Sequence, residues 1–435
     1  MFLILKRAVS IVLWLCILVL LVWATQLKDP HLLVIRGYET ALILAGCVAG
    51  FLAVRLKNRG IERTALFALL VIAAGITLGT ESLHHYRKAA VLGRDFDIER
   101  RLSGHFIIGY RNLADLRPLL TRGIVGGVFV TRRNAYGKTV EELGREIAEM
   151  QQLRRSSGMP DLIVATDQEG GVVSRLSPPL KQRPALSGLV ADFPRQVELL
   201  MQAEAYGRRQ GAELSDLGVT VNFSPVVDLK TEAIGNRLDL HSRISQRAIS
   251  SSPEQTAAVA LAYGKGLESR GVQPTLKHFP GLGGVRVDTH HFSATLATPV
   301  EELAARDWLP FRLAAGQSDA LIMLGHVILP AIDPENPVSF SRAVVQDVIR
   351  GAWQHEGLLV TDDLTMAAAY RHGICEATVK GLNAGVDLLL ISYDDEKFYE
   401  AMYCAVAAYK DGSLDKDQLR RSGRRLAPKD GRAAK

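Results

Sequence analysis

The sequence predicts an α/β protein: a (β/α)8 TIM-type barrel preceded by transmembrane helices. Over about 300 residues, short apolar runs rich in β-branched side chains alternate with longer amphipathic stretches. The runs are apolar on both faces, as expected of parallel strands covered by helices. Three of them end in polar clusters, and barrel enzymes carry their active sites at the carboxyl ends of the strands.

Residues 1–81 read as a membrane segment of about three spans. Residues 8–27 are uncharged and follow Lys6-Arg7, and about 20 apolar residues cross ~30 Å of hydrocarbon as a helix. Residues 41–54 form a shorter second run, the weakest of the three, and residues 64–80 form the third. A signal peptide cleaved after Val22-Trp23-Ala24 is an alternative for the first run. Cleavage there would change only the number of spans.

The distribution of basic residues predicts the orientation. Six basic residues lie before the first run and between the second and third runs: Lys6, Arg7 and the four of residues 55–63. The first loop has only Lys28 and Arg36, so the side with six basic residues is predicted to be cytoplasmic. With three spans, the C-terminal body is then extracytoplasmic, attached to the inner or plasma membrane. The basic residues that follow the third span oppose this orientation. Residues 82–103 read as a polar connector.

Charge and cysteine content narrow the class of protein. The first 100 residues hold 12 Lys or Arg and 7 Asp or Glu, so they carry most of the net charge of +6. A nearly neutral body argues against a nucleic-acid partner, which would favour a basic stripe on the folded domain. The four cysteines lack CxxC or Cys/His metal spacing, and we interpret them as small apolar side chains.

The barrel is expected over residues 104–425. Its predicted strands are 105–110, 126–130, 162–167, 219–225, 275–280, 320–327, 357–363 and 387–392. The predicted helices are 140–152, 196–217, 253–269, 300–315, 341–356 and 375–384. A doubly wound sheet is the alternative, but no GxGxxG follows the first strand. The chain from Arg420 onward is expected to be poor in helix, and residues 426–435 form a basic tail.

Two adjacent carboxylates end the seventh predicted strand. Glycoside cleavage requires a nucleophile or base together with a proton donor to the leaving oxygen. Because side chains alternate along a strand, Asp362 and Asp363 cannot both point into the barrel mouth. Asp362 is the better candidate nucleophile, and Asp363 is expected to support the loop or cap the segment after it. In the alternative, both carboxylates only cap the next helix.

A glycine-rich loop after the fifth strand carries Asp288-Thr289-His290. A carboxylate two residues from a histidine can accept its ring N–H, orient the imidazole and raise its basicity. Such a His290 could protonate the leaving sugar oxygen and later deprotonate water. The alternative is a pair that only satisfies a turn. His291 is the adjacent rival.

Four further side chains are candidate sugar contacts. Lys277 and His278 end the fifth strand, although Lys277 could instead form only an ion pair at the barrel rim. Asp167 ends the third strand and offers two acceptor oxygens for vicinal hydroxyls. The chain at 168–171 is expected to turn sharply away from it. Arg247 is a further contact, with Arg243 close enough in sequence to be confused with it.

These clusters resemble glycoside hydrolase family 3, in particular its single-domain β-N-acetylglucosaminidase (β-N-acetylhexosaminidase) branch. The family pattern reads like DQEGGRV, NFxPVxD, RSFG, KHFPGHGDxxxDSH, PAIDPxxPxxxS and SDDLxM. This chain has DQEGGVV at 167–173, NFSPVVD at 222–228, RAIS at 247–250, KHFPGLGGVRVDTH at 277–290, PAIDPENPVS at 330–339 and TDDLTM at 361–366. The resemblance covers residues 104–425. It departs from the pattern at Val172, Ala248-Ile249, Leu282 and Gly284, and in having a membrane segment.

The resemblance implies a retaining exo-β-N-acetylglucosaminidase that acts through a covalent glycosyl-enzyme. By position, the nucleophile is Asp362, the acid/base is His290 held by Asp288, and the sugar contacts are Asp167, Arg247, Lys277 and His278. The expected substrates are cell-wall-type glycans such as muropeptides, and no metal or cofactor is implied. The alternatives are another β-glycosidase, a phosphorylase or transglycosylase of the same family, and a membrane-anchored sugar-binding protein without turnover.

Overall fold

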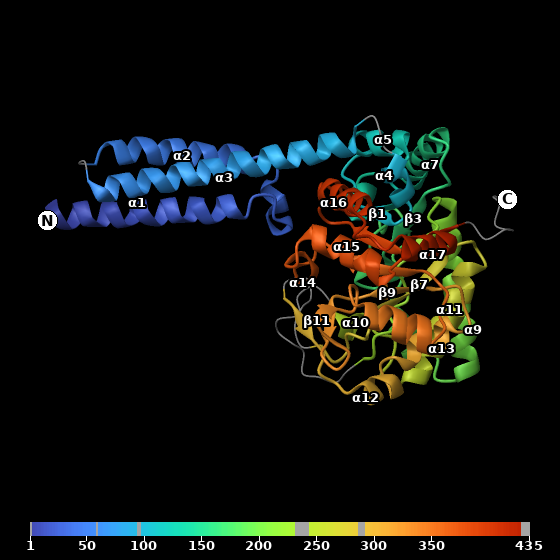
Figure 1. Ribbon diagram of the computed structural model, residues 1–435. Helices are drawn as coiled ribbons and strands as arrows, with labels where there is room; N and C mark the ends of the chain where they lie inside the picture. The colour runs from blue at the N-terminus through green and yellow to red at the C-terminus, as the bar shows by residue number, and fades with distance from the viewer. Residues whose placement is uncertain (1, 58–59, 94–96, 231–242, 286–291, 428–435) are drawn as a thin grey trace. The chain divides into compact units, whose positions relative to one another are not determined.

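The computed structural model describes residues 2–57, 60–93, 97–230, 243–285 and 292–427. The chain divides into two compact units, Met1–Val91 and Leu92–Lys435 (Figure 1). The boundary lies inside the predicted connector 82–103. In that segment, helix α3 continues to Val91, and helix α4 (Asp97–Ser103) occupies the last part.

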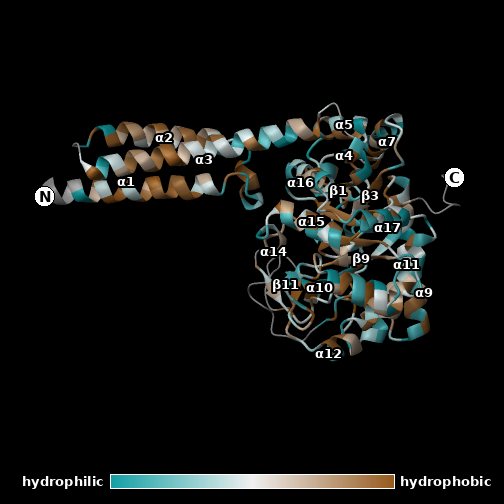
Figure 2. Cartoon of the chain, in the orientation of Figure 1, coloured by the Kyte–Doolittle hydropathy of each residue, from teal (hydrophilic) through white to brown (hydrophobic). Residues whose placement is uncertain are grey.

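In its described residues, the first unit contains α1 (Phe2–Thr25), the 3-10 segment η1 (Pro30–Ile35), α2 (Glu39–Arg55) and α3 (Ile61–Val91). Its helices are apolar inside and outside: a buried cluster includes Ile17, Ile43 and Leu66, whereas Val19 and Val48 are exposed. A helix that is apolar all round is typical of a membrane environment. Figure 2 shows this hydrophobic colouring along α1 and α2, with the C-terminal part of α3 hydrophilic.

Within the described chain, two helices are long and apolar enough to cross a membrane, Arg7–Thr25 and Ile61–Val91. Helix α2, at 17 residues, is not among them. Helix α2 contains the apolar run 41–54, which was predicted to be the weakest of the three spans.

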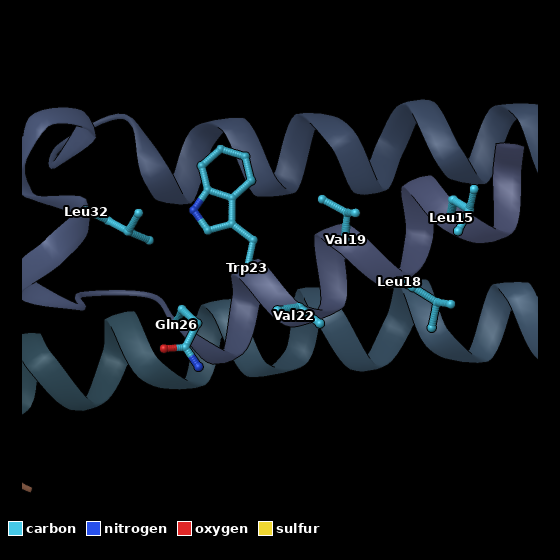
Figure 3. A pocket seen from close by; sticks show the side chains of 7 residues that line it. All are labelled: Leu15, Leu18, Val19, Val22, Trp23, Gln26 and Leu32. Atoms are coloured by element: carbon cyan, nitrogen blue, oxygen red, sulfur yellow. The ribbon is translucent and has the colours of Figure 1, made fainter. Parts of the chain in front are cut away.

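An apolar groove of about 430 Å³ lies in the helical unit (Figure 3). Leu15, Val19 and Trp23 follow one another at helical spacing on α1, and Leu32 from η1 lies at one end. No charged side chain lines the groove, and none of the predicted site residues does. The predicted site residues all belong to the second unit.

The second unit contains a closed barrel of eight parallel strands in the order β1-β13-β12-β9-β7-β6-β3-β2, which confirms the predicted fold class. Each predicted strand overlaps one strand of the barrel. The barrel strands are β1 (Phe106–Ile108), β2 (Gly127–Phe129), β3 (Ile163–Thr166), β6 (Val221–Asn222), β7 (Gln273–Phe279), β9 (Leu321–Leu324), β12 (Leu359–Asp363) and β13 (Leu388–Ile391).

One hydrophobic cluster joins side chains from seven of these strands and the residue that follows β6. Its members are Ile107, Phe129, Ala165, Val221, Phe223, Leu321, Met323, Val360, Leu388 and Leu390. Short strands suffice because each is buried under helices on its outer face.

Two small sheets and a set of helices complete the unit (Figure 1). The sheets contain β4 (Gln168–Gly170) with β5 (Val173–Ser174), and β11 (Asp333–Pro337), β10 (Val327–Leu329) and β8 (Ala294–Thr295). The helices are α5 (Leu113–Arg122), α6 (Arg132–Ala135), α7 (Val140–Ser156), α8 (Leu186–Asp192), α9 (Gln196–Asp216), α10 (Ile244–Arg247), α11 (Pro253–Glu268), α12 (Val300–Ala305), α13 (Leu309–Ala315), the π-helical η2 (Ala343–Ala352), α14 (Ala367–Tyr370), α15 (Ile374–Ala384), α16 (Lys397–Asp411) and α17 (Lys416–Leu426).

Local sequence explains where several helices begin and end. Thr139 and Glu142 form a capping box at the start of α7, and Ser252 caps α11 ahead of a proline. The predicted helix 300–315 is instead two helices. The second begins around Pro310, which fits a first helical turn but not a helix interior, because proline lacks an N–H.

The expectation of a helix-poor C-terminus was wrong for the described part of that segment. Helix α17 covers Lys416–Leu426 and is held at the amino end of β13 by Asp387, which is fully buried. The Asp387 carboxylate accepts hydrogen bonds from Ser422 Oγ at 2.6 Å and from Arg425 Nε at 2.9 Å. It also accepts one from Arg350 Nη2 at 2.7 Å. Most of the predicted basic tail, residues 428–435, lies outside the described residues.

The interpretation of the cysteines as four apolar side chains was also wrong for two of them. Cys375 on α15 and Cys404 on α16 form a disulfide with their Cα atoms 5.4 Å apart. Their sequence separation of 29 matches no motif, so only the packing of the two helices reveals the pair. Cys16 and Cys47, in the helical unit, are free thiols.

Candidate active site

Four of the predicted site residues come together at the carboxyl ends of β3 and β7, where a carboxylate absent from the prediction joins them. Glu169 on β4 accepts hydrogen bonds from Arg247 Nη2 at 2.7 Å and Nε at 2.9 Å. Lys277 Nζ lies 2.7 Å from Glu169 and 2.7 Å from Asp167. Arg247 Nη2 is 3.4 Å from His278 Nε2. Charged groups from β4, β7, α10 and the end of β3 thus form one network.

The turn expected at 168–171 is present, but its effect on Glu169 differs from the prediction. Gly170 and Gly171 both have positive φ, of 94° and 62°, which favours glycine at these positions. A Cβ on Gly170 would lie 2.3 Å from the hydroxyl of Tyr206. The strand therefore folds back tightly, and it places Glu169 in the network with 6% of its surface exposed.

Lys277 and His278 are adjacent, yet both contact the network. The pairing of β7 with β9 shifts register between Leu276 and Phe279. A register shift of this kind redirects side chains relative to a regular strand. This local irregularity allows two neighbouring residues to serve the same site.

His278 is oriented by Asp228, a fully buried residue that sequence reasoning did not single out. His278 Nδ1 lies 2.7 Å from Asp228 Oδ2, and Leu282 N donates to Asp228 Oδ1 at 2.7 Å. Because a guanidinium group only donates, Nε2 of His278 accepts from Arg247 and the ring proton sits on Nδ1. Asp228 thereby fixes the imidazole and the first turn of the following loop.

The charges of the network stabilise one another. Burial disfavours the ionised form of Glu169, but Arg247 and Lys277 outweigh it and lower the pKa of the carboxyl to about 2. Burial by itself would lower the pKa of the Arg247 guanidinium. The neighbouring Glu169 carboxylate outweighs burial, so the pKa is raised. Glu169 is therefore an anion that holds two cations in place. Asp167, whose side chain is 21% exposed, remains open to a ligand.

The adjacent carboxylates of β12 have different surroundings. Both oxygens of Asp363 are used within the protein: Oδ1 accepts from Thr365 N and Oγ1, and Oδ2 accepts from Ser392 Oγ and Tyr393 N. This confirms that Asp363 supports the loop. Asp362 is partly exposed, and its Oδ1 accepts from the N–H of Asp363 at 2.8 Å. Asp362 is thus the more exposed residue of the pair, at the carboxyl end of a barrel strand.

The predicted dyad of Asp288 and His290 lies outside the described residues, as does His291. The start of its loop is described: Gly281 lies within the turn that Asp228 anchors and has φ of 104°, and a Cβ there would lie 3.0 Å from Cβ of Asp307. Burial raises the pKa of Asp307. Among the residues that the structure describes, no group of three or more His, Cys, Asp or Glu side chains is arranged to hold a metal ion.

Sequence reasoning missed Glu169 and Asp228, although both lie in motifs that it quoted. Glu169 is the third residue of DQEGGVV and Asp228 the last of NFSPVVD. The available signal was an acidic residue a few positions after a predicted strand. Arg247, the partner of Glu169, lies 78 positions away in the chain, and His278, the partner of Asp228, lies 50 positions away. Neither pairing could therefore be predicted from the neighbouring sequence.

A closed parallel barrel with charged side chains at the carboxyl ends of its strands has the architecture of the (β/α)8-barrel enzymes. Residues 98–428 match the family described as glycosyl hydrolase family 3 N terminal domain. The chain therefore belongs to glycoside hydrolase family 3.

Known relatives agree with this assignment. The β-hexosaminidase of Pseudomonas aeruginosa (strain LESB58) is 36% identical over 286 residues, which cover 65% of this chain and 79% of that protein. The β-hexosaminidase of Stenotrophomonas maltophilia (strain K279a) is 35% identical over 297 residues, covering 66% and 82%. This chain is a glycoside hydrolase similar to β-hexosaminidases, and its substrate is a carbohydrate.

Solved structures share the fold. A family 3 β-N-acetylglucosaminidase from Paenibacillus sp. str. FPU-7 aligns with a TM-score of 0.69 at 31% identity, over 76% of this chain. The matched region spans 62% of that enzyme's length. A β-N-acetylhexosaminidase from Beutenbergia cavernae aligns with a TM-score of 0.68 at 25% identity, covering 77% of this chain and 98% of that one.

Proposed function

We propose that this protein is a retaining exo-β-N-acetylglucosaminidase that removes terminal N-acetylglucosamine from cell-wall-type glycans, including muropeptides. The observation that carries the proposal is the contrast between Asp362 and Asp363. Asp363 has one oxygen engaged by its own loop and the other by the residues that follow β13, whereas Asp362 is partly exposed at the end of a barrel strand. An accessible carboxylate in that position suits a nucleophile.

In the proposed mechanism, an oxygen of Asp362 attacks the anomeric carbon, and the bond to the leaving oxygen breaks as that oxygen gains a proton. His290, paired with Asp288, supplies this proton and then takes one from the water that displaces Asp362 from the anomeric carbon. Two displacements at the same carbon restore the β configuration, so the enzyme retains stereochemistry.

The network around Glu169 is assigned to sugar binding. Asp167 offers a partly exposed carboxylate to vicinal hydroxyls, and Lys277 and Arg247 supply charged donors beside it. Because Glu169 holds both cations and Asp228 holds His278, these groups are oriented before a sugar arrives. Such pre-organisation lowers the entropic cost of binding.

The substrate assignment is tested with the full-length protein in detergent, assayed against aryl β-N-acetylglucosaminide and aryl β-glucoside. We expect turnover of the N-acetyl substrate, with the β anomer of the sugar as the first product. Turnover of the glucoside alone would reassign the enzyme to another β-glycosidase. Release of a sugar 1-phosphate when inorganic phosphate is added, in place of free sugar, would identify a phosphorylase.

We further propose that residues 1–81 form a membrane anchor in which all three helices cross the bilayer. Ion-pair clusters lie at both ends of the bundle: Glu62 contacts Lys57 at 2.6 Å, and Glu81 contacts Lys28 at 3.2 Å and Thr40 at 2.8 Å. Glu62 and Glu81 are 19 residues apart on α3, which is about 28 Å of helix. That length is close to the ~30 Å of a bilayer's hydrocarbon core. The intervening apolar surface supports the anchor.

The disulfide supports an extracytoplasmic position for the barrel, in agreement with the bias of basic residues. Structural disulfides persist in oxidising compartments and are rare in the cytosol. Cys375 and Cys404 join two helices of the barrel unit, whereas the free thiols lie in the helical unit.

The location is tested by fractionating cells that make the full-length protein and alkylating thiols at lysis. We expect the protein in the membrane fraction, resistant to high salt and released by detergent, with Cys375 and Cys404 alkylated only after reduction. A Cys375→Ser, Cys404→Ser double variant is the control for the alkylation pattern. Recovery in the soluble fraction would contradict the anchor, and alkylation of both cysteines without reductant would contradict the compartment.

A further inference from the structure

His326 is a buried histidine beside the candidate nucleophile that the proposed mechanism does not use. It follows β9 and has 2% of its surface exposed. Strand β9 is the barrel neighbour of β12, the strand that ends in Asp362 and Asp363. The ring packs against Phe340 with centroids 5.8 Å apart.

Both ring nitrogens of His326 are engaged. Nε2 lies 3.0 Å from the backbone carbonyl oxygen of Asp363, and Nδ1 lies 2.8 Å from Ser339 Oγ. Because a carbonyl only accepts, Nε2 carries the proton and Nδ1 accepts from the serine hydroxyl. Burial lowers the pKa of His326, against the influence of the Asp362 and Asp363 carboxylates, which agrees with a neutral ring. The Asp363 carbonyl therefore selects the tautomer with the proton on Nε2, and Ser339 supplies the donor that this tautomer accepts at Nδ1.

The hydrogen bond to Asp363 lies beyond the end of the ladder between β12 and β9. On the β9 side, the last pair of the ladder is Thr361 with Leu324. On the β13 side, the register shifts between Val360 and Asp363. The main chain at Asp362 is thus flanked by an ended ladder and an irregular one, and the His326 ring supplies the next hydrogen bond along the strand.

We propose that His326 is a positioning residue: its ring holds the main chain that carries Asp362, and Ser339 orients the ring through its hydrogen bond to Nδ1. This inference rests on the proposed function, because it takes Asp362 as the nucleophile. It also assigns a role to the last residue of PAIDPENPVS, the segment 330–339. A nucleophile held to within a fraction of an ångström attacks efficiently, and misplacement by about 1 Å can lower the rate about 100-fold.

The test compares His326→Asn with His326→Gln in the full-length protein. The Gln amide nitrogen reaches about as far as Nε2 and can still donate to Asp363, whereas the Asn amide reaches only about as far as Nδ1. For His326→Asn we expect kcat on the aryl N-acetylglucosaminide to fall about 100-fold. We expect KM and inhibition by free N-acetylglucosamine to stay within about twofold, because the sugar contacts are elsewhere. His326→Gln is expected to restore most of kcat.

Ser339→Ala serves as the second variant, should His326→Asn fail to fold. It retains the imidazole and removes one hydrogen bond, so we expect kcat to fall about tenfold at unchanged KM. Wild-type kcat in folded His326→Asn or in Ser339→Ala overturns the inference. Equal losses in His326→Asn and His326→Gln overturn it as well.

Asp362→Asn, assayed alongside, separates this inference from the proposed function. Full activity in His326→Asn with an inactive Asp362→Asn protein overturns only the role of His326. Retained activity in Asp362→Asn overturns the proposed nucleophile, whatever the His326 variants do.

Discussion

Replacing Asp362 with Asn is expected to lower turnover of an aryl β-N-acetylglucosaminide by at least about 10³-fold, because an amide cannot form the glycosyl ester. The fold should survive: Asn retains an oxygen to accept from the N–H of Asp363, and the side chain is partly exposed. Steady-state kinetics and a thermal unfolding curve measure the two effects. Loss of turnover with an unchanged unfolding curve is the expected result.

Asp363→Asn is the matched control, since it changes the neighbouring carboxylate in the same way. Asp363 accepts four hydrogen bonds, and an amide presents an N–H₂ group to donors on one side. We expect this variant to lose about 1–3 kcal/mol of stability, with a smaller loss of turnover than Asp362→Asn.

Adding azide to an Asp362→Gly variant tests directly whether Asp362 is the nucleophile. Azide entering the vacated space would attack the anomeric carbon once and yield the α-glycosyl azide. Formation of that product supports the nucleophile. An Asp362→Asn protein with near wild-type turnover would contradict it.

Glu169→Gln is expected to cost about 3–5 kcal/mol of stability, because it leaves Arg247 and Lys277 buried with one counter-charge fewer. We also expect kcat/KM to fall about 100-fold, since both cations lose the group that orients them. Denaturant unfolding and steady-state kinetics measure these changes. Glu149→Gln is the control: its ion pair with Arg117 is 43% exposed on the Glu side, so its removal should cost less than about 1 kcal/mol.

The same carboxylate predicts a dependence of stability on pH. The pKa of Glu169 is about 2 in the folded protein, below its ordinary value of 4.5. The native state therefore favours the anion, and its stabilising contribution is complete above about pH 4.5 and lost as the pH falls towards 2. Across this interval we expect the unfolding free energy of Glu169→Gln to fall less steeply than that of the wild type. Parallel curves would contradict the role of Glu169 as the buried anion.

Features encoded locally could be predicted from the sequence. Alternating apolar runs and amphipathic stretches predicted the eight strands. A strand that is buried on both faces is a continuous apolar run, and this run is visible in each strand's own sequence. The polar residues that follow the apolar runs could also be placed at the barrel mouth, because parallel strands all end on one side of a barrel. The weakness of the second apolar run, now the 17-residue α2, was also visible in its length.

Features that depend on a distant partner could not be predicted. The segment 168–171 was expected only to turn away from Asp167, because nothing in that segment shows that Arg247 and Lys277 surround Glu169. Helix α17 was expected to fray, because its sequence is basic and its anchor is the buried Asp387 on a different element. The cysteine pair had no motif spacing for the same reason.

The sequence by itself therefore determined the barrel, the order of its motifs and the choice of Asp167, Arg247, Lys277, His278 and Asp362 as candidates. The tertiary structure decided which of these are held together, by which buried carboxylates, and which aspartate of the 362–363 pair is accessible. The physical reason is that periodicity and strand ends are properties of neighbouring residues. Charge pairing, tautomer choice and disulfide formation are set by atoms that meet only after the chain has folded.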